Sequence, residues 1–157
     1  MIDYNDGKIM EAVREIPLYG EYDVVVAGGG VAGVAAAVEA ARCGKKVVLI
    51  EKATQLGGLA TIGLINLFVP MCNGRGVQII KGMCQELLDL SIKYCYDNIA
   101  NDWKNGEPGE GNTKERYYTK YSAEIFTLAL TELVKNEGVD ILFDSVVADS
   151  VMENNVC

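Results

Sequence analysis

Short apolar runs alternate with stretches of helical periodicity along this chain. Residues 22–27 and 46–51 are apolar runs rich in β-branched side chains, the composition of buried parallel strands. Between them, residues 31–43 are rich in alanine and end at Gly44, a residue type that commonly follows a helix. A strand, a glycine turn, a helix and a strand in about 30 residues form a βαβ unit, whose right-handed crossover makes the two strands parallel.

Two further helices are predicted in the second half. A glycine-dotted loop leads to residues 78–94, and a second helix begins after Ser122, a residue type that caps helix N-termini, and continues until Gly138. Apolar residues recur at helical spacing in both segments. They are Ile80, Met83, Leu87, Leu90 and Tyr94 in the first helix and Phe126, Leu130 and Leu133 in the second.

The last part of the chain predicts strands at residues 140–143 and 146–152, followed by a hairpin turn at 153–155. The chain reaches Cys157 where a return strand is expected to begin. A strand without a partner leaves an open edge that favours pairing with another copy. We therefore expect an incomplete domain, a fragment of a longer protein, with possible homo-oligomer formation through the exposed edge.

The composition limits the classes of partner. The chain has 157 residues, the size of one domain, and carries 14 basic against 22 acidic residues, a net charge of −8. This balance excludes a broad basic face, so we expect a small-molecule substrate, no nucleic acid and no membrane. The uncharged stretch 53–74 contains too many glycines and polar residues for a transmembrane helix.

Histidine is absent, which removes imidazole bases and histidine metal ligands from the possible chemistry. The five cysteines are odd in number and none forms a Cys-x-x-Cys pair, so we expect neither a disulfide framework nor a metal site, but reduced thiols in a cytoplasmic protein. These cysteines are Cys43, Cys72, Cys84, Cys95 and Cys157.

One motif carries chemistry. The sequence Gly28-Gly29-Gly30-Val31-Ala32-Gly33 fits G-x-G-x-x-G and lies between a predicted strand and a predicted helix. Gly28 permits a tight turn, Gly30 lets a pyrophosphate approach the backbone, and Gly33 lets the helix pack closely on the sheet. The free N–H groups and positive dipole at the helix N-terminus would hold the pyrophosphate, so an acidic protein can still bind it locally.

Glu51 ends the second predicted strand, at the position where an acidic side chain accepts hydrogen bonds from an adenosine ribose. A carboxylate there also repels a 2′-phosphate, which disfavours NADP. The strand, turn, helix and terminal acid together predict adenine-dinucleotide binding in a Rossmann-like α/β domain with a parallel sheet and flanking helices. The alternative is a glycine-rich turn with an incidental surface glutamate.

Three segments resemble the N-terminal part of FAD-dependent oxidoreductases with the glutathione-reductase-type flavin fold: residues 21–33, 47–52 and 55–61. The resemblance implies FAD as the cofactor, with a second glycine loop running along its pyrophosphate and ribityl chain. The implied cofactor-binding residues are Gly28, Gly30, Val31, Ala32, Gly33, Glu51, Lys52, Gly57, Gly58, Ala60 and Thr61.

The resemblance resumes at residues 121–124, 136–143 and 146–151, and implies the third parallel strand, the start of an antiparallel β-meander, and a backbone contact from Val147 to the adenine. We divide the chain into a lead-in, 1–20, and an FAD-binding domain, 21–157. That domain carries a helical and loop insertion at about 66–120, whose polar part, 98–120, is predicted to be exposed.

The resemblance implies a parent enzyme that transfers hydride between an organic substrate and FAD. We expect the isolated chain to bind FAD weakly or not at all and to show no turnover. The second loop has no cysteine pair, so the dithiol chemistry of disulfide reductases is not supported, and the family's late Gly-Asp motif and substrate domain lie outside the chain. Two alternatives stay open: an NAD-binding dehydrogenase domain, and a non-catalytic α/β domain.

No residue is assigned a catalytic role. Tyr117, Tyr118 and Tyr121 are candidates to stack on a ring, although hydrophobic anchoring of a loop is favoured. Cys72 and Cys84 are candidates to approach a flavin, although solvent-shielded thiols are favoured. Arg75 is a candidate to bind a substrate carboxylate, although a solvated loop arginine is favoured.

Overall fold

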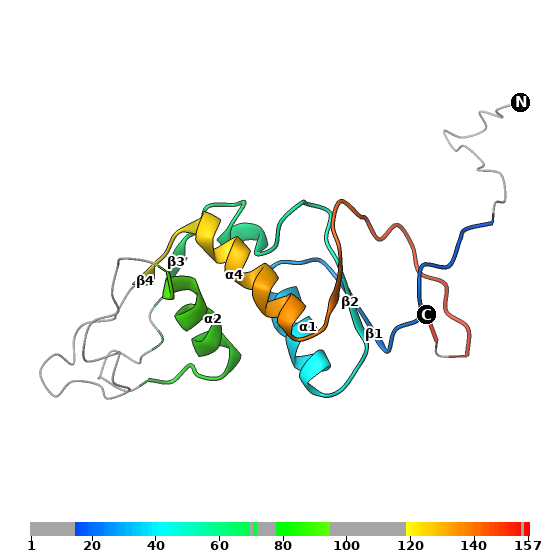
Figure 1. The fold of residues 1–157 in the computed structure, drawn as a ribbon, viewed down its shortest axis with the longest axis horizontal. Helices are drawn as coiled ribbons and strands as arrows, with labels where there is room; N and C mark the ends of the chain where they lie inside the picture. The colour runs from blue at the N-terminus through cyan, green and yellow to red at the C-terminus, as the bar shows by residue number, and fades with distance from the viewer. Residues whose placement is uncertain (1–14, 70, 72–77, 95–118, 155) are drawn as a thin grey trace, which may run out of the picture.

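The computed structural model describes residues 15–69, 71, 78–94, 119–154 and 156–157 (Figure 1). Several residues named above lie outside this part of the chain: Cys72, Arg75, Cys95, Tyr117 and Tyr118, and residues 98–118 of the insertion. The elements are β1 (Val24–Ala27), α1 (Val31–Arg42), β2 (Val47–Ile50), the 3-10 helix η1 (Gly58–Ala60), β3 (Leu67–Phe68), α2 (Met83–Ile92), β4 (Thr119–Lys120), α4 (Ala123–Asn136) and β5 (Asp140–Leu142).

The main sheet is parallel and has the strand order β1-β2-β5. Val24 pairs with Val47 at the start of the β1–β2 ladder, and Ile50 pairs with Leu142 at the end of the β2–β5 ladder. The predicted βαβ unit and third parallel strand are confirmed. A second, two-stranded sheet joins β3 and β4 in antiparallel orientation.

The core lies between the sheet and the helices. Helix α4 lies between α1 and α2 and contacts both (Figure 1). Since parallel crossovers are right-handed, the connections from β1 to β2 and from β2 to β5 bring α1 and α4 to the same face of the sheet. The fully buried side chains come from every layer: Val34 and Val38 of α1, Val47 and Leu49 of β2, Leu88 of α2, and Phe126, Leu130 and Val134 of α4.

Strand β1 is covered on one face, which corrects the prediction of a fully buried strand. Val24 and Val26 pack against the core, whereas the Val25 side chain is 56% exposed. The reason is topological, because α1 and α4 share one face of the sheet and β1 is an edge strand within the described residues.

Both helices predicted in the second half form, α2 with a later start than predicted and α4 with its predicted start. Helix α2 starts at Met83, later than the periodicity suggested, because Gly82 adopts φ 65°, outside the helical region. Ser122 caps α4 as predicted, since its hydroxyl accepts a hydrogen bond from the backbone N–H of Ile125 at 3.2 Å. Residues Thr119 and Lys120, expected in an exposed loop, instead form β4, and Thr119 is buried.

The strand predicted at 146–152 does not form. Asp144 and Ser145 donate backbone hydrogen bonds to the carbonyl oxygens of Ala53 and Glu51, and the chain then continues without a ladder. Val146 and Val151 are largely exposed. A strand requires a partner ladder, and among the described residues the only pairing in this region is the isolated Glu153–Val156 bridge, which closes the predicted turn.

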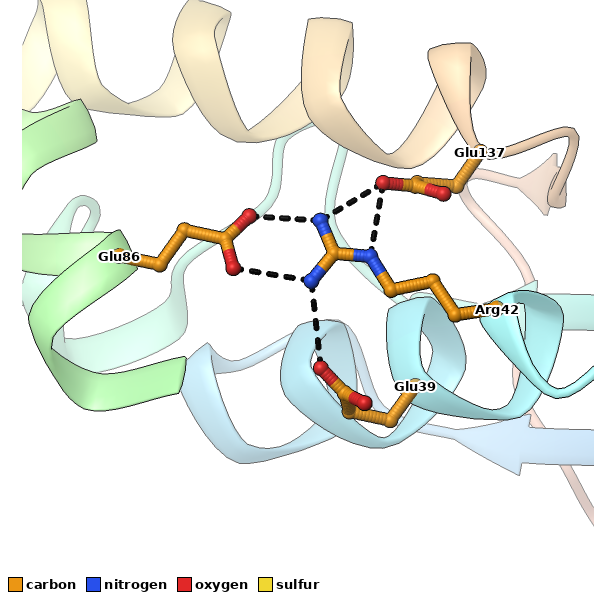
Figure 2. Close-up of polar contacts among 4 residues, drawn as sticks. All are labelled: Glu39, Arg42, Glu86 and Glu137. Carbon is orange, nitrogen blue, oxygen red and sulfur yellow. Dashed lines mark hydrogen bonds and ion pairs between the residues drawn. The ribbon is translucent and has the colours of Figure 1, made fainter. Parts of the chain in front are cut away.

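Arg42 joins the three helices at one point (Figure 2). Its guanidinium donates two hydrogen bonds to Glu86 of α2, at 2.6 and 2.9 Å, and two to Glu137 at the end of α4, at 2.7 and 2.9 Å. A weaker contact of 3.2 Å reaches Glu39 on α1 itself. The bidentate geometry toward Glu86 fixes α2 relative to α1 and α4.

Candidate cofactor-binding site

The turn between β1 and α1 depends on two glycines. Gly28 adopts φ 104°, a conformation that disfavours residues with a Cβ, and its N–H donates to the Ile50 carbonyl at 2.7 Å. At Gly33, an added Cβ would collide with the Gly28 carbonyl oxygen. The turn and the first turn of α1 therefore contact each other through backbone atoms.

Gly30 has a different environment. It is the N-cap of α1, with φ −64° and ψ 173°, and no side chain caps the helix there. A Cβ added at Gly30 would meet no atom within 4 Å. The N–H groups of Val31, Ala32 and Gly33 have no acceptor within the helix, because the first residues of any helix lack one. The positive end of α1 therefore faces open space, which suits an anionic ligand.

The second glycine loop lies directly against the first. The Gly57 N–H donates to the Gly29 carbonyl at 2.8 Å, and Gly57 and Gly30 form an isolated parallel bridge. A Cβ added at Gly58 would lie 3.2 Å from the Gly30 Cα. Gly57 and Gly58 also adopt positive φ angles. The two loops form one continuous backbone surface, which their separation in the sequence does not reveal.

The Glu51 carboxylate connects the first loop to the segment that leads into the second. Oε2 accepts a hydrogen bond from the Gly29 N–H at 2.5 Å, and Oε1 accepts one from the Ala53 N–H at 2.7 Å. Glu51 is only 8% exposed, so the alternative interpretation as an incidental surface glutamate is wrong. A carboxylate has about four lone-pair directions, so it retains acceptor capacity for ribose hydroxyls.

Thr61 supports the second loop from inside. Its side chain is buried, and its hydroxyl donates to the Leu56 carbonyl at 2.6 Å. The Thr127 hydroxyl of α4 donates to the same oxygen at 2.9 Å. The Thr61 bond closes the loop on itself, and the Thr127 bond attaches the loop to α4.

A cavity of about 450 Å³ opens where the loops meet. The N-terminus of α1 and the second loop form one part of its wall, and the β3–β4 region forms another. The residues that line it are Gly30, Val31, Ala32, Gly57, Leu59, Ala60, Ile65, Leu67, Phe68 and Tyr121.

The predicted site residues divide into groups. Gly30, Val31, Ala32, Gly57 and Ala60 line the cavity, whereas Gly28, Gly33, Glu51, Gly58 and Thr61 brace the two loops. Lys52 has an exposed side chain, and Val147 is 48% exposed in the segment after β5.

Sequence reasoning missed Leu59, Ile65, Leu67 and Phe68 in the cavity wall. The apolar character of residues 64–69 was the available signal. This apolar pattern does not distinguish a cavity wall from ordinary core, because both are apolar.

A parallel sheet with a glycine turn leading into a helix N-terminus, a buried acid at the end of β2, and an adjoining cavity defines a dinucleotide-binding α/β domain. Residues 23–157 match the model of a family described as FAD dependent oxidoreductase. The chain belongs to that family, and it forms the FAD-binding part of a flavin-dependent oxidoreductase. The open backbone surface at Gly30 and the adjoining second loop fit FAD.

Individual relatives match over shorter stretches. Thioredoxin reductase of Ureaplasma parvum is 32% identical over 76 residues, which are 48% of this chain and 25% of that protein. Dihydrolipoyl dehydrogenase of Trypanosoma brucei brucei is 49% identical over 45 residues, 29% of this chain and 9% of that protein. The matched region thus spans a quarter or less of these curated relatives.

Solved structures show the same fold. A geranylgeranyl bacteriochlorophyll reductase-like protein from Thermoplasma acidophilum superimposes with a TM-score of 0.51 and 22% identity, over 85% of this chain and 32% of that chain. L-amino acid deaminase from Proteus vulgaris gives a TM-score of 0.50 and 16% identity, over 92% of this chain and 44% of that chain. No helix in the described residues is long and apolar enough to cross a membrane.

Proposed function

We propose that this chain holds FAD in an enzyme that transfers hydride between a small organic substrate and the flavin. The observation that carries the proposal is the joining of two glycine loops at Gly30 and Gly57 beside a single cavity. The first loop with Glu51 would account for any adenine dinucleotide, NAD included. The second loop is the feature that favours FAD, because the resemblance to flavin enzymes implies that it runs along the pyrophosphate and ribityl chain.

The residues of the site have separate tasks. The N–H groups of residues 31–33 would hold the pyrophosphate, and Glu51, which braces the first loop, would accept hydrogen bonds from the adenosine ribose. Gly57 and Ala60, which line the cavity, would border the ribityl chain. When bound, FAD supplies the redox chemistry, and the protein supplies placement and electrostatics.

The cavity wall is mostly apolar. Leu67 and Phe68 are apolar, and Tyr121 is the only described cavity-lining residue with a titratable side chain. Burial raises the pKa of the Tyr121 phenol, so the group stays neutral at physiological pH and acts as a hydrogen-bond donor. We infer that acid–base steps of the reaction use groups outside this wall.

We also infer a cytoplasmic location, supported by free thiols at Cys43, Cys84 and Cys157. The net charge of −8 supports a small-molecule substrate over nucleic acid or anionic membrane surfaces. Self-association through an exposed strand edge is a proposal that the oligomeric state in solution tests, for example by analytical ultracentrifugation.

Equilibrium titration of the full-length protein with FAD and with NAD tests the proposed function. FAD should bind at least about 10-fold more tightly, a difference of about 1.4 kcal/mol, because the second loop would add contacts along the flavin half of the cofactor. The purified protein should also be yellow. Tighter binding of NAD would contradict the proposal, and the Gly30→Val variant provides the control for binding elsewhere.

A further inference from the structure

We propose that Tyr121 is a positioning residue of the flavin site, one that fixes the second glycine loop through its hydroxyl and closes the cavity with its ring. The inference rests on the proposed function, because it assumes that FAD occupies the cavity. It adds a residue outside both glycine motifs, and the sequence alone favoured only a hydrophobic anchor at this position.

The hydroxyl of Tyr121 holds both ends of one loop. It lies 3.1 Å from the Ala60 carbonyl oxygen and 2.9 Å from the Ile65 carbonyl oxygen, and its single proton is shared between these two acceptors. Between these ends the loop is a tight turn, in which the Ile65 N–H donates to the Leu59 carbonyl at 3.0 Å. The phenol therefore fixes a segment whose residues Leu59, Ala60 and Ile65 all line the cavity.

Tyr121 itself has little freedom to move. Its side chain and backbone are 6% exposed, and its ring contacts Phe126 at 4.9 Å and Phe68 at 5.4 Å between ring centroids. Its backbone exchanges two hydrogen bonds with Asn66, one from the Tyr121 N–H at 3.3 Å and one from the Asn66 Nδ2 at 3.1 Å. A side chain held in this way loses no further rotamer entropy when a ligand binds.

The position of Tyr121 in the chain explains how it links distant parts. It follows β4 directly and precedes Ser122, the cap of α4. The segment that it holds follows Gly57 and Gly58 directly, the two residues that lie against Gly30. Tyr121 thereby fixes the distance between the N-terminus of α1 and the β3–β4 wall, the two surfaces between which FAD must fit.

Tyr121→Phe tests the hydroxyl and keeps the ring. We expect the FAD dissociation constant to rise about 3- to 10-fold, the equivalent of one neutral hydrogen bond, and the visible absorption band of the bound flavin to shift. Tyr121→Leu also removes the ring and should weaken FAD binding further. Tyr22→Phe is the matched control, because it removes a phenol that bonds Asp140 on the exposed surface away from the cavity.

The outcomes separate three cases. Weaker FAD binding and an altered flavin spectrum in Tyr121→Phe, with Tyr22→Phe unchanged, support the proposal. A lower melting temperature of Tyr121→Phe with unchanged FAD affinity and spectrum would overturn it and leave Tyr121 a structural residue. Failure of the unsubstituted protein to bind FAD would overturn the proposed function, and this inference with it.

Discussion

Gly30 and Gly33 belong to one turn but meet different physical requirements. The backbone of Gly30 has dihedral angles that valine adopts readily, and its missing Cβ faces open space. We predict that Gly30→Val abolishes FAD binding while the melting temperature changes little, because the added side chain fills the space that the phosphate oxygens need. Calorimetric titration and circular dichroism measure the two effects.

Gly33→Val is the matched control, because a Cβ there would collide with the Gly28 carbonyl oxygen. This variant should lower the stability of the fold itself. Normal FAD binding by Gly30→Val would show that the phosphate lies elsewhere.

Glu51 is predicted to act on both cofactor and fold. In Glu51→Gln, one acceptor oxygen is replaced by an NH₂ group that faces a backbone N–H, at Gly29 or at Ala53. Hydrogen bonds to a charged group contribute about 1.5–3 kcal/mol, so FAD affinity should fall about 10- to 100-fold, and the melting temperature of the FAD-free protein should fall as well.

Glu39→Gln, an exposed acid on α1, should change neither FAD affinity nor the melting temperature appreciably. An unchanged melting temperature in Glu51→Gln would mean that the carboxylate does not brace the turn. The flavin chemistry itself should be the same in all three proteins, since Glu51 does not line the cavity.

At the scale of elements, Arg42 links α1 to α2 and to the end of α4 (Figure 2). We predict that Arg42→Met destabilises the protein by about 0.5–1 kcal/mol at neutral pH, a modest value because the Arg42 side chain is one third exposed and solvent screens its charge. Chemical denaturation measures the difference. Lys45→Met, on the surface after α1, is the control for loss of a positive charge.

The loss of stability in Arg42→Met should depend on pH. The hydrogen bonds from Arg42 hold the pKa of Glu86 below its usual value, so this contribution is fully present above the ordinary glutamate pKa of about 4.3 and is lost as pH falls through the lowered pKa of the folded state. The stability difference between the unsubstituted protein and Arg42→Met should therefore narrow in acid. A difference that stays constant to pH 2 would contradict this assignment.

At the scale of the whole molecule, the site joins the sheet, the helix layer and the β3–β4 sheet. A ligand that contacts all of them should stabilise the fold more than one that contacts only the first loop. We predict that FAD raises the melting temperature more than ADP does at equal concentration. The stabilisation by a ligand grows with the ratio of its concentration to its dissociation constant, and a ratio of 100 stabilises the folded state by about 2.7 kcal/mol. Gly30→Val should show neither shift, and equal shifts for FAD and ADP would mean that the second loop makes no contact.

Features that depend on local chemistry could be predicted from the sequence. The apolar runs specified β1, β2 and β5, Ser122 specified the start of α4, and Gly28, Gly30 and Gly33 specified the turn, because each of these depends on side chains and backbone angles within a few residues. The family resemblance of the glycine loops pointed to FAD for the same reason.

Tertiary structure decided what depends on contacts between distant segments. It placed Gly57 against Gly30, gave the Glu51 carboxylate two backbone donors, and brought Tyr121 to the carbonyls of Ala60 and Ile65. It also left residues 146–152 without a strand and exposed one face of β1, because strand formation and burial both require a neighbouring element. Apolar patterning shows that a segment can be buried, and only the packing of the chain determines what it is buried against.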